Sequence, residues 1–247
     1  MSHTQLVFLA TILLLPPSPL TAAPLPPREV TDRLERALKA LEPGAFQGTF
    51  TLRVTSAVSK PDGSGREDQT EVLEVVQPAS GEALTRVIHA DASGKDVTAS
   101  RQREIDHETS SRQGKATSGD SKGSESISVT TALPAGEDAA LYEFGPPTLE
   151  GGLLVASFAP RAGERNRDGV ATGRLAWRGD TLDPVWVEAR PVKLPKHASE
   201  LSLRFELGRE GELLHLRRMI TDGAGGMLWI KRKIHAELEI SEVRQAR

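Results

Sequence analysis

Residues 200–207 read Glu-Leu-Ser-Leu-Arg-Phe-Glu-Leu, with a large apolar side chain at every second position. A period of two places these apolar side chains on one face of a β-strand and the polar ones on the other. The same alternation runs most regularly through residues 227–240. Successive one-sided strands of this kind build an antiparallel sheet with one wet face and one apolar face.

Similar segments cover most of the chain. The candidate strands are 46–58, 70–77, 83–90, 97–107, 149–158, 169–178, 184–189, 199–207, 212–221 and 227–240. Gly223-Ala-Gly-Gly226 lies between two of them, which predicts a hairpin turn and not a phosphate-binding loop. No repeat of fixed length is visible, which argues against a propeller or solenoid. The sequence therefore predicts a mainly β (α+β) fold of about ten strands.

One amphipathic helix precedes the strands. The apolar residues with helical spacing are Val30, Leu34, Ala37, Leu38 and Leu41, and Pro43-Gly44 ends the run. We expect a helix of about three turns that packs on the apolar sheet face. A second short helix is predicted within residues 133–144.

Residues 108–125 contain Ser, Gly, Lys, Asp and Thr but no large apolar side chain. This composition predicts a disordered or mobile loop. Such a loop serves either as a lid or partner-binding segment or, more simply, as a variable surface insertion.

The N-terminal segment carries an apolar run at residues 6–15, followed by Pro16, Pro17, Pro19 and then Leu20-Thr21-Ala22-Ala23. The run is too short to span a membrane, which takes about 20 residues. We interpret residues 1–23 as a secretory signal peptide, although no basic residue precedes the run. The prolines argue against a buried N-terminal strand or helix. Residues 24–247 are then a single domain without a transmembrane segment, located in the periplasm or secreted.

Composition narrows the function classes. The chain has no cysteine, which excludes disulfides, a thiol nucleophile and a cysteine-ligated metal. The net charge is −3 and aromatic residues make up 4%. A nucleic-acid-binding protein usually shows a basic stripe with stacking aromatics, so the sequence predicts no nucleic-acid partner.

No motif for catalysis or cofactor binding is present. The histidines lack metal-motif spacing, and no nucleophile elbow, phosphate loop or zinc-protease helix occurs. We therefore predict no catalytic residue, no metal site, no cofactor and no enzymatic activity. Trp177, Trp186 and Trp229 are expected either in the core or at the rim of a cavity or interface.

Two stretches resemble the LolA/LolB superfamily of periplasmic lipoprotein carriers. Residues 35–58 lead from the helix end through Pro43-Gly44 into the strand Gly48-Thr-Phe-Thr-Leu-Arg-Val, and residues 173–188 resemble a hairpin around an Asp-Pro turn. The resemblance implies a strongly curved, unclosed β-barrel whose concave apolar face is covered by helices. It also implies a lipid or lipoprotein as partner.

The leading hypothesis is an exported, non-catalytic envelope protein that binds a lipid or lipoprotein acyl chain between sheet and helices. The predicted cavity lining is Leu34, Leu38, Phe50, Leu52, Leu203, Phe205, Ile230 and Ile234. The alternative is a structural or interaction protein of the cell envelope, with a filled core and a protein partner. A hydrolase built from dispersed residues is a third, weaker hypothesis.

Overall fold

The computed structural model describes residues 26–80, 82–115, 133–227 and 230–246. The predicted signal peptide and Trp229 lie outside these ranges. The strands are β1 (Gly48–Ser59), β2 (Glu67–Gln77), β3 (Leu84–Ala92), β4 (Lys95–Asp96), β5 (Tyr142–Phe144), β6 (Thr148–Glu150), β7 (Leu153–Pro160), β8 (Ala171–Trp177), β9 (Pro184–Pro191), β10 (Ala198–Glu210), β11 (Leu213–Met227) and β12 (Ile230–Gln245). The helices are α1 (Arg28–Lys39), α2 (Thr98–Lys115) and the short 3₁₀ helix η1 (Gly136–Leu141).

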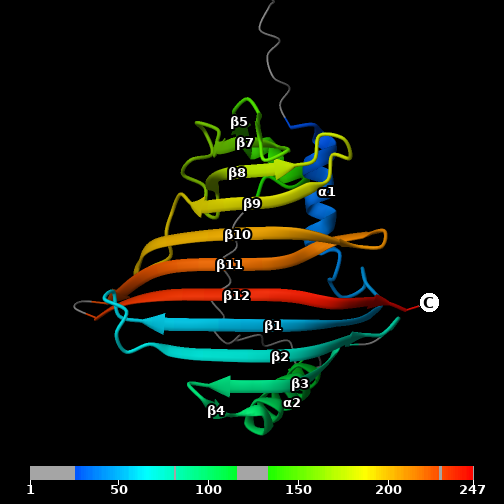
Figure 1. Cartoon of the computed structure of the whole chain (residues 1–247), viewed down its shortest axis with the longest axis vertical. Helices are drawn as coiled ribbons and strands as arrows, with labels where there is room; N and C mark the ends of the chain where they lie inside the picture. The colour runs from blue at the N-terminus through cyan, green and yellow to red at the C-terminus, as the bar shows by residue number, and fades with distance from the viewer. Residues whose placement is uncertain (1–25, 81, 116–132, 228–229, 247) are drawn as a thin grey trace, which may run out of the picture.

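All the described strands join one antiparallel sheet in the order β4-β3-β2-β1-β12-β11-β10-β9-β8-β7-β5, with β6 also paired to β7. The last strand, β12, lies beside β1, so the first and last strands meet in the middle of the sheet (Figure 1). The outermost strands β4 and β5 are not paired with each other, and the sheet does not close. The predicted fold class, a curved and unclosed antiparallel sheet, is confirmed.

The two α-helices cover the same face of the sheet at opposite ends. Helix α1 packs on β9, β11 and η1, whereas α2 packs on β3 (Figure 1). The strand register links the two regions: Leu203 beneath α1 and Leu73 beneath α2 belong to the side-chain rows that face inward. The predicted N-terminal helix and the short helix at 136–141 are confirmed.

Helix α2 corrects two predictions, because residues 97–107 are not a strand and residues 108–115 continue the helix. The remainder of the predicted loop, 116–125, lies outside the described residues. The Asp96 carboxylate accepts the Thr98 N–H at 2.9 Å and thus caps the helix start. The helix is attached through polar contacts: Gln102 Oε1 accepts the Val87 N–H, and Thr98 Oγ1 accepts the Ala90 N–H. A helix held this way carries almost no apolar stripe.

The predicted hairpin turn at Gly223–Gly226 is also wrong. These residues continue β11, where Gly223 pairs with Leu201 and Gly225 with Ala198. Strands β11 and β12 are therefore longer than the alternation alone indicated.

The buried side chains form separate clusters among the described residues. The largest joins Val30, Leu34 and Ala37 of α1 to Trp177 and the inward side chains of β7–β10. A second cluster surrounds Phe50 at one end of β1, β2 and β12, and a third lies beneath α2. Between the regions under the two α-helices, the inward side of β11, β12 and β1 has few fully buried side chains.

Candidate ligand groove

An open apolar groove of about 820 Å³ lies on the concave face, beside the C-terminal half of α1. Its floor consists of inward side chains from β10, β11 and β12, above all Leu203, Phe205, Met219, Thr221 and Ile234. Leu38 of α1 and Leu133 contribute from the helical side. The volume falls within the roughly 300–1,000 Å³ that is typical of ligand sites.

Small residues create this hollow. Thr221 lies between Leu203 on β10 and Ala236 on β12, and the next inward positions along β11 are Gly223 and Gly225. An inward row of Thr, Gly and Gly places little side-chain volume above the backbone. The groove exists because β11 presents a small side chain or bare backbone opposite Leu203 and Leu201 of β10.

The loop between β9 and β10 closes one end of the groove. Pro195 and His197 line it, and the His197 carbonyl accepts the Gly226 N–H at 2.8 Å. His197 has a φ of 71°, a left-handed conformation that is uncommon outside glycine. A Cβ atom at Gly225 would lie 2.4 Å from the His197 carbonyl oxygen, so only glycine permits this close approach.

Charged side chains gather at the mouth of the groove. Lys196 and Arg232 line it together with Glu200, which is the one acidic residue among its described lining. Arg232 is half-buried, whereas Lys196 and Glu200 are exposed. The mouth therefore carries two cations against one anion.

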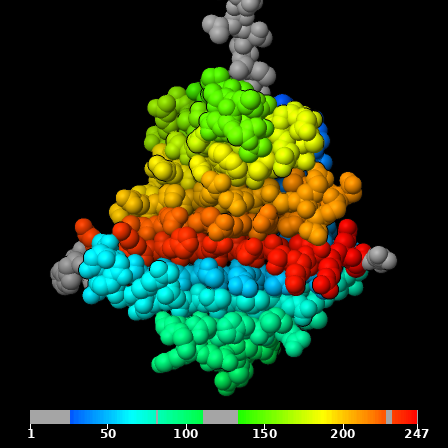
Figure 2. All heavy atoms as spheres, in the orientation of Figure 1, coloured from blue at the N-terminus to red at the C-terminus, as the bar shows by residue number. Residues whose placement is uncertain are grey.

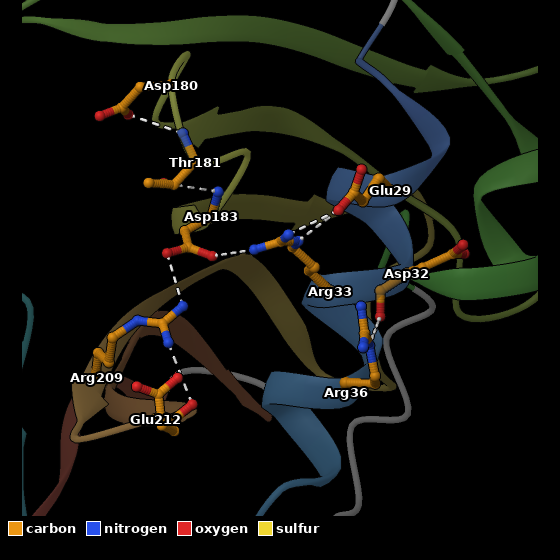
Figure 3. Close-up of polar contacts among 9 residues, drawn as sticks. All are labelled: Glu29, Asp32, Arg33, Arg36, Asp180, Thr181, Asp183, Arg209 and Glu212. Carbon is orange, nitrogen blue, oxygen red and sulfur yellow. Dashed lines mark hydrogen bonds and ion pairs between the residues drawn. The ribbon is translucent and has the colours of Figure 1, made fainter.

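Helix α1, which forms one side of the groove, is attached to the sheet by an ionic cluster (Figure 3). Arg33 donates to Asp183 Oδ1 at 2.7 Å, and Arg209 of β10 donates to Asp183 Oδ2 at 2.8 Å. Arg33 also donates to Glu29 at 2.7 Å. Asp183 stands at the end of the β8–β9 connection and is only 8% exposed. This carboxylate thus connects the helix, the hairpin and β10.

The environment of Asp183 favours its charged form. Burial raises the pKa of the carboxyl, but hydrogen bonds from Arg209 and Arg33 outweigh this effect and hold the pKa below its ordinary value. The cluster therefore remains ionised at neutral pH.

The predicted lining residues separate into three groups. The structure brings Leu38, Leu203, Phe205 and Ile234 together in the groove. Leu34 lies in the core beneath α1, and Phe50 and Leu52 belong to the cluster at the far end of the sheet. The side chain of Ile230 lies outside what the structure describes. Leu34, Phe50 and Leu52 therefore do not line the groove itself.

Sequence reasoning missed several lining residues. Met219 and Thr221 face inward because a bulge at Arg217 shifts the register of β11. A strict period of two counted from Leu216 would instead place Arg218 and Ile220 on the inward face. Arg232 occupies an inward position on β12, opposite Gly225. The sequence did contain a signal for Arg232, because this charged residue interrupts the otherwise apolar inward row of β12.

The opposite, convex face has a different character, and Figure 2 shows this side of the molecule. The Trp186 ring lies between the guanidinium groups of Arg174 and Arg204, at 5.6 and 5.1 Å from its centre. Arg218 donates two hydrogen bonds to Glu237 at 2.7 and 2.8 Å. Several charges on this face are thus paired across strands. Trp177, by contrast, is buried in the core beneath α1.

No group of three or more His, Asp or Glu side chains in the described ranges could hold a metal ion. No helix within the described part of the chain has the length and apolar content needed to cross a membrane.

Comparison with known proteins gives structural likenesses at low sequence identity. No protein-family model and no curated protein matches the sequence. A domain named for outer-membrane lipoprotein sorting, from Vibrio parahaemolyticus, is 11% identical with a TM-score of 0.34, covering 88% of this chain and 91% of that one. A DUF1329 family protein from Desulfovibrio piger is 10% identical with a TM-score of 0.33, covering 89% and 93%.

The MucA/MucB complex from Pseudomonas aeruginosa also contains a similar chain, with 9% identity and a TM-score of 0.22, covering 89% of this chain and 99% of that one. The likeness is one of fold.

Proposed function

We propose that this chain is an exported, non-catalytic protein of a bacterial envelope that holds an apolar ligand in the concave groove. The ligand class is a lipid or the acyl chain of a lipoprotein. The observation that carries the proposal is the 820 Å³ apolar groove between α1 and the floor of β10, β11 and β12. An N-terminal segment typical of a signal peptide supports the location.

The floor of the groove can hold an apolar chain without specific polar contacts. It offers Leu, Phe, Met and Ile side chains, and burial of each CH₂ group contributes about 0.8 kcal/mol. Two additional CH₂ groups should therefore strengthen binding by roughly tenfold until the groove is full. No directional chemistry is required for such binding, which agrees with a sequence that lacks catalytic motifs.

The first test is native mass spectrometry of the protein purified from its own host. We expect a bound species of lipid mass that dissociates on activation, and a mature N-terminus after Ala22 or Ala23. A chain that is always ligand-free and co-purifies with a stoichiometric protein partner would instead support the alternative, an interaction protein of the envelope.

A matched pair of variants links the ligand to the groove. Thr221→Phe adds a ring to the inward face of β11, where it would fill the groove. Thr55→Phe makes the same change on β1 at an outward-facing position, opposite Glu237. We expect Thr221→Phe to abolish the bound species and Thr55→Phe to retain it. Equal ligand occupancy in both folded variants would exclude the groove as the site.

A further inference from the structure

We infer that the ligand is an amphiphile with an anionic head group, which binds between Arg232 and Lys196 while its chain lies on the groove floor. This inference rests on the proposed function and deepens it, because it assigns the chemistry at the mouth of the same groove. Carboxylate and phosphate heads share the required chemistry, namely a compact group of negatively charged oxygens.

The first observation concerns Arg232, a cation on the inward face without a partner among the described residues. Its side chain is half-buried on the inward face of β12, at the position that pairs with Gly225. Within the described ranges it forms no hydrogen bond or ion pair. A partly desolvated charge is costly unless it is paired. The convex arginines show the contrast, because Arg204 and Arg218 each contact a glutamate.

The second observation concerns Lys196, another cation in the groove lining. It lines the same groove from the β9–β10 loop and, among the described residues, has no acidic partner either. The Gly226–His197 hydrogen bond attaches the loop to β11, so the backbone of Lys196 lies at this end of the groove. Glu200 is exposed and offsets one of the two positive charges. The remaining positive charge complements one anionic head.

The geometry separates head from chain. Apolar side chains such as Phe205 and Met219 line the floor, and the cations stand at one end of it. Arginine binds carboxylate and phosphate through paired N–H donors, whereas a neutral hydroxyl offers no charge to match it. Head-group charge should therefore set the affinity among ligands of equal chain length.

The experiment measures displacement of the neutral fluorophore N-phenylnaphthylamine from the purified chain at low salt. The competitors are dodecanoate, dodecyl phosphate, 1-dodecanol and dodecyltrimethylammonium. The ionic compounds are used below their micellar concentrations and dodecanol below its solubility limit. We expect the two anionic compounds to displace the fluorophore at least tenfold more strongly than dodecanol, with the cationic compound weakest. The ratio of dodecanoate to dodecyl phosphate distinguishes a fatty-acid head from a phospholipid-type head.

Charge variants locate the head group. Arg232→Gln and Lys196→Gln should each reduce the preference for anionic over neutral competitors by threefold or more, and Arg232→Lys should retain part of it. Lys231→Gln is the matched control, because it removes the same charge from the adjacent residue of β12 on the opposite face. The control should leave the preference unchanged.

The outcomes separate this inference from the proposed function. If the fluorophore and every competitor fail to bind, the proposed function is wrong. If dodecanol binds as strongly as dodecanoate, the groove is apolar without head-group recognition and the present inference is overturned. It is likewise overturned if Arg232→Gln weakens neutral and anionic competitors equally, because the arginine would then act on the shape of the groove.

Discussion

The two parts of the concave face are built from the same alternating strands but differ in what covers them. Beneath the N-terminal half of α1, Leu34 and Val30 are fully buried against Trp177 and Leu175. Beside the C-terminal half of α1, Ile234 remains 47% exposed, although it occupies an inward position on β12. The first region is an ordinary core, and the second is an apolar surface without a complete cover.

The difference shows why period-two patterning cannot by itself locate a ligand site. Both regions show the same alternation, because inward positions are apolar in each. They are distinguished by side-chain volume and by helix length: α1 ends at Lys39, and the inward row of β11 shrinks to glycine. A binding surface arises where the sheet extends beyond its helical cover.

The largest change in stability should come from truncating a side chain in the core beneath α1. Leu34→Ala removes a fully buried side chain, so the free energy of unfolding should fall by about 2–5 kcal/mol. Ile234→Ala, the same kind of truncation in the groove, should cost about 0.5 kcal/mol because the side chain is half-exposed. Urea unfolding followed by circular dichroism measures both. Equal losses would mean that the groove is packed like the core.

The attachment of α1 offers the next largest effect. Asp183→Asn removes the charge that accepts hydrogen bonds from Arg33 and Arg209, and should lower the free energy of unfolding by about 1–3 kcal/mol. Glu29→Gln is the matched control, since it removes an exposed partner of the same Arg33 and should cost less than about 1 kcal/mol. If the two variants are equally stable, Asp183 does not hold the helix on the sheet.

The contribution of Asp183 to stability should also depend on pH, in a direction that its pKa determines. The pKa of Asp183 is lowered in the folded state, so its contribution is fully present above the unfolded-state pKa of about 3.9. The contribution is lost as the pH falls through the folded-state pKa. The stability difference between the native chain and Asp183→Asn should stay constant from about pH 7 to 5 and shrink below about pH 4. A difference that persists unchanged to pH 2 would contradict this assignment.

The fold could be predicted from the sequence wherever a periodic apolar signal existed. Leu201, Leu203, Phe205 and Leu207 specify an inward row, and the stripe of α1 specifies one helical face. Helix α2 gave no such signal. Among its described side chains only Ile105 joins the apolar cluster beneath it, together with Val97 just before the helix, and the other anchors are polar. Polar side chains that bond to an edge strand leave no period in a sequence.

The groove was predictable only in part, for a related reason. Leu38, Leu203, Phe205 and Ile234 follow from the apolar rows, and all four line it. The hollow itself depends on glycines. These residues favour turns when read locally, but inside a strand they often mark the close approach of another backbone segment. Here the approaching segment is the backbone at His197. This contact arises from the tertiary structure and cannot be predicted from the local sequence.

The smallest effect tests that approach directly. A Cβ atom at Gly225 would lie 2.4 Å from the His197 carbonyl oxygen, whereas one at Gly223 would lie 3.4 Å from that of Glu200, which is ordinary contact. Gly225→Ala should therefore displace the β9–β10 loop and cost about 1 kcal/mol, with Gly223→Ala close to neutral. Hydrogen exchange at the Gly226 amide, whose hydrogen bond holds the loop, should accelerate in the first variant alone. Unchanged exchange in both variants would mean that the loop does not depend on the glycine, and that the mouth of the groove is held by other contacts.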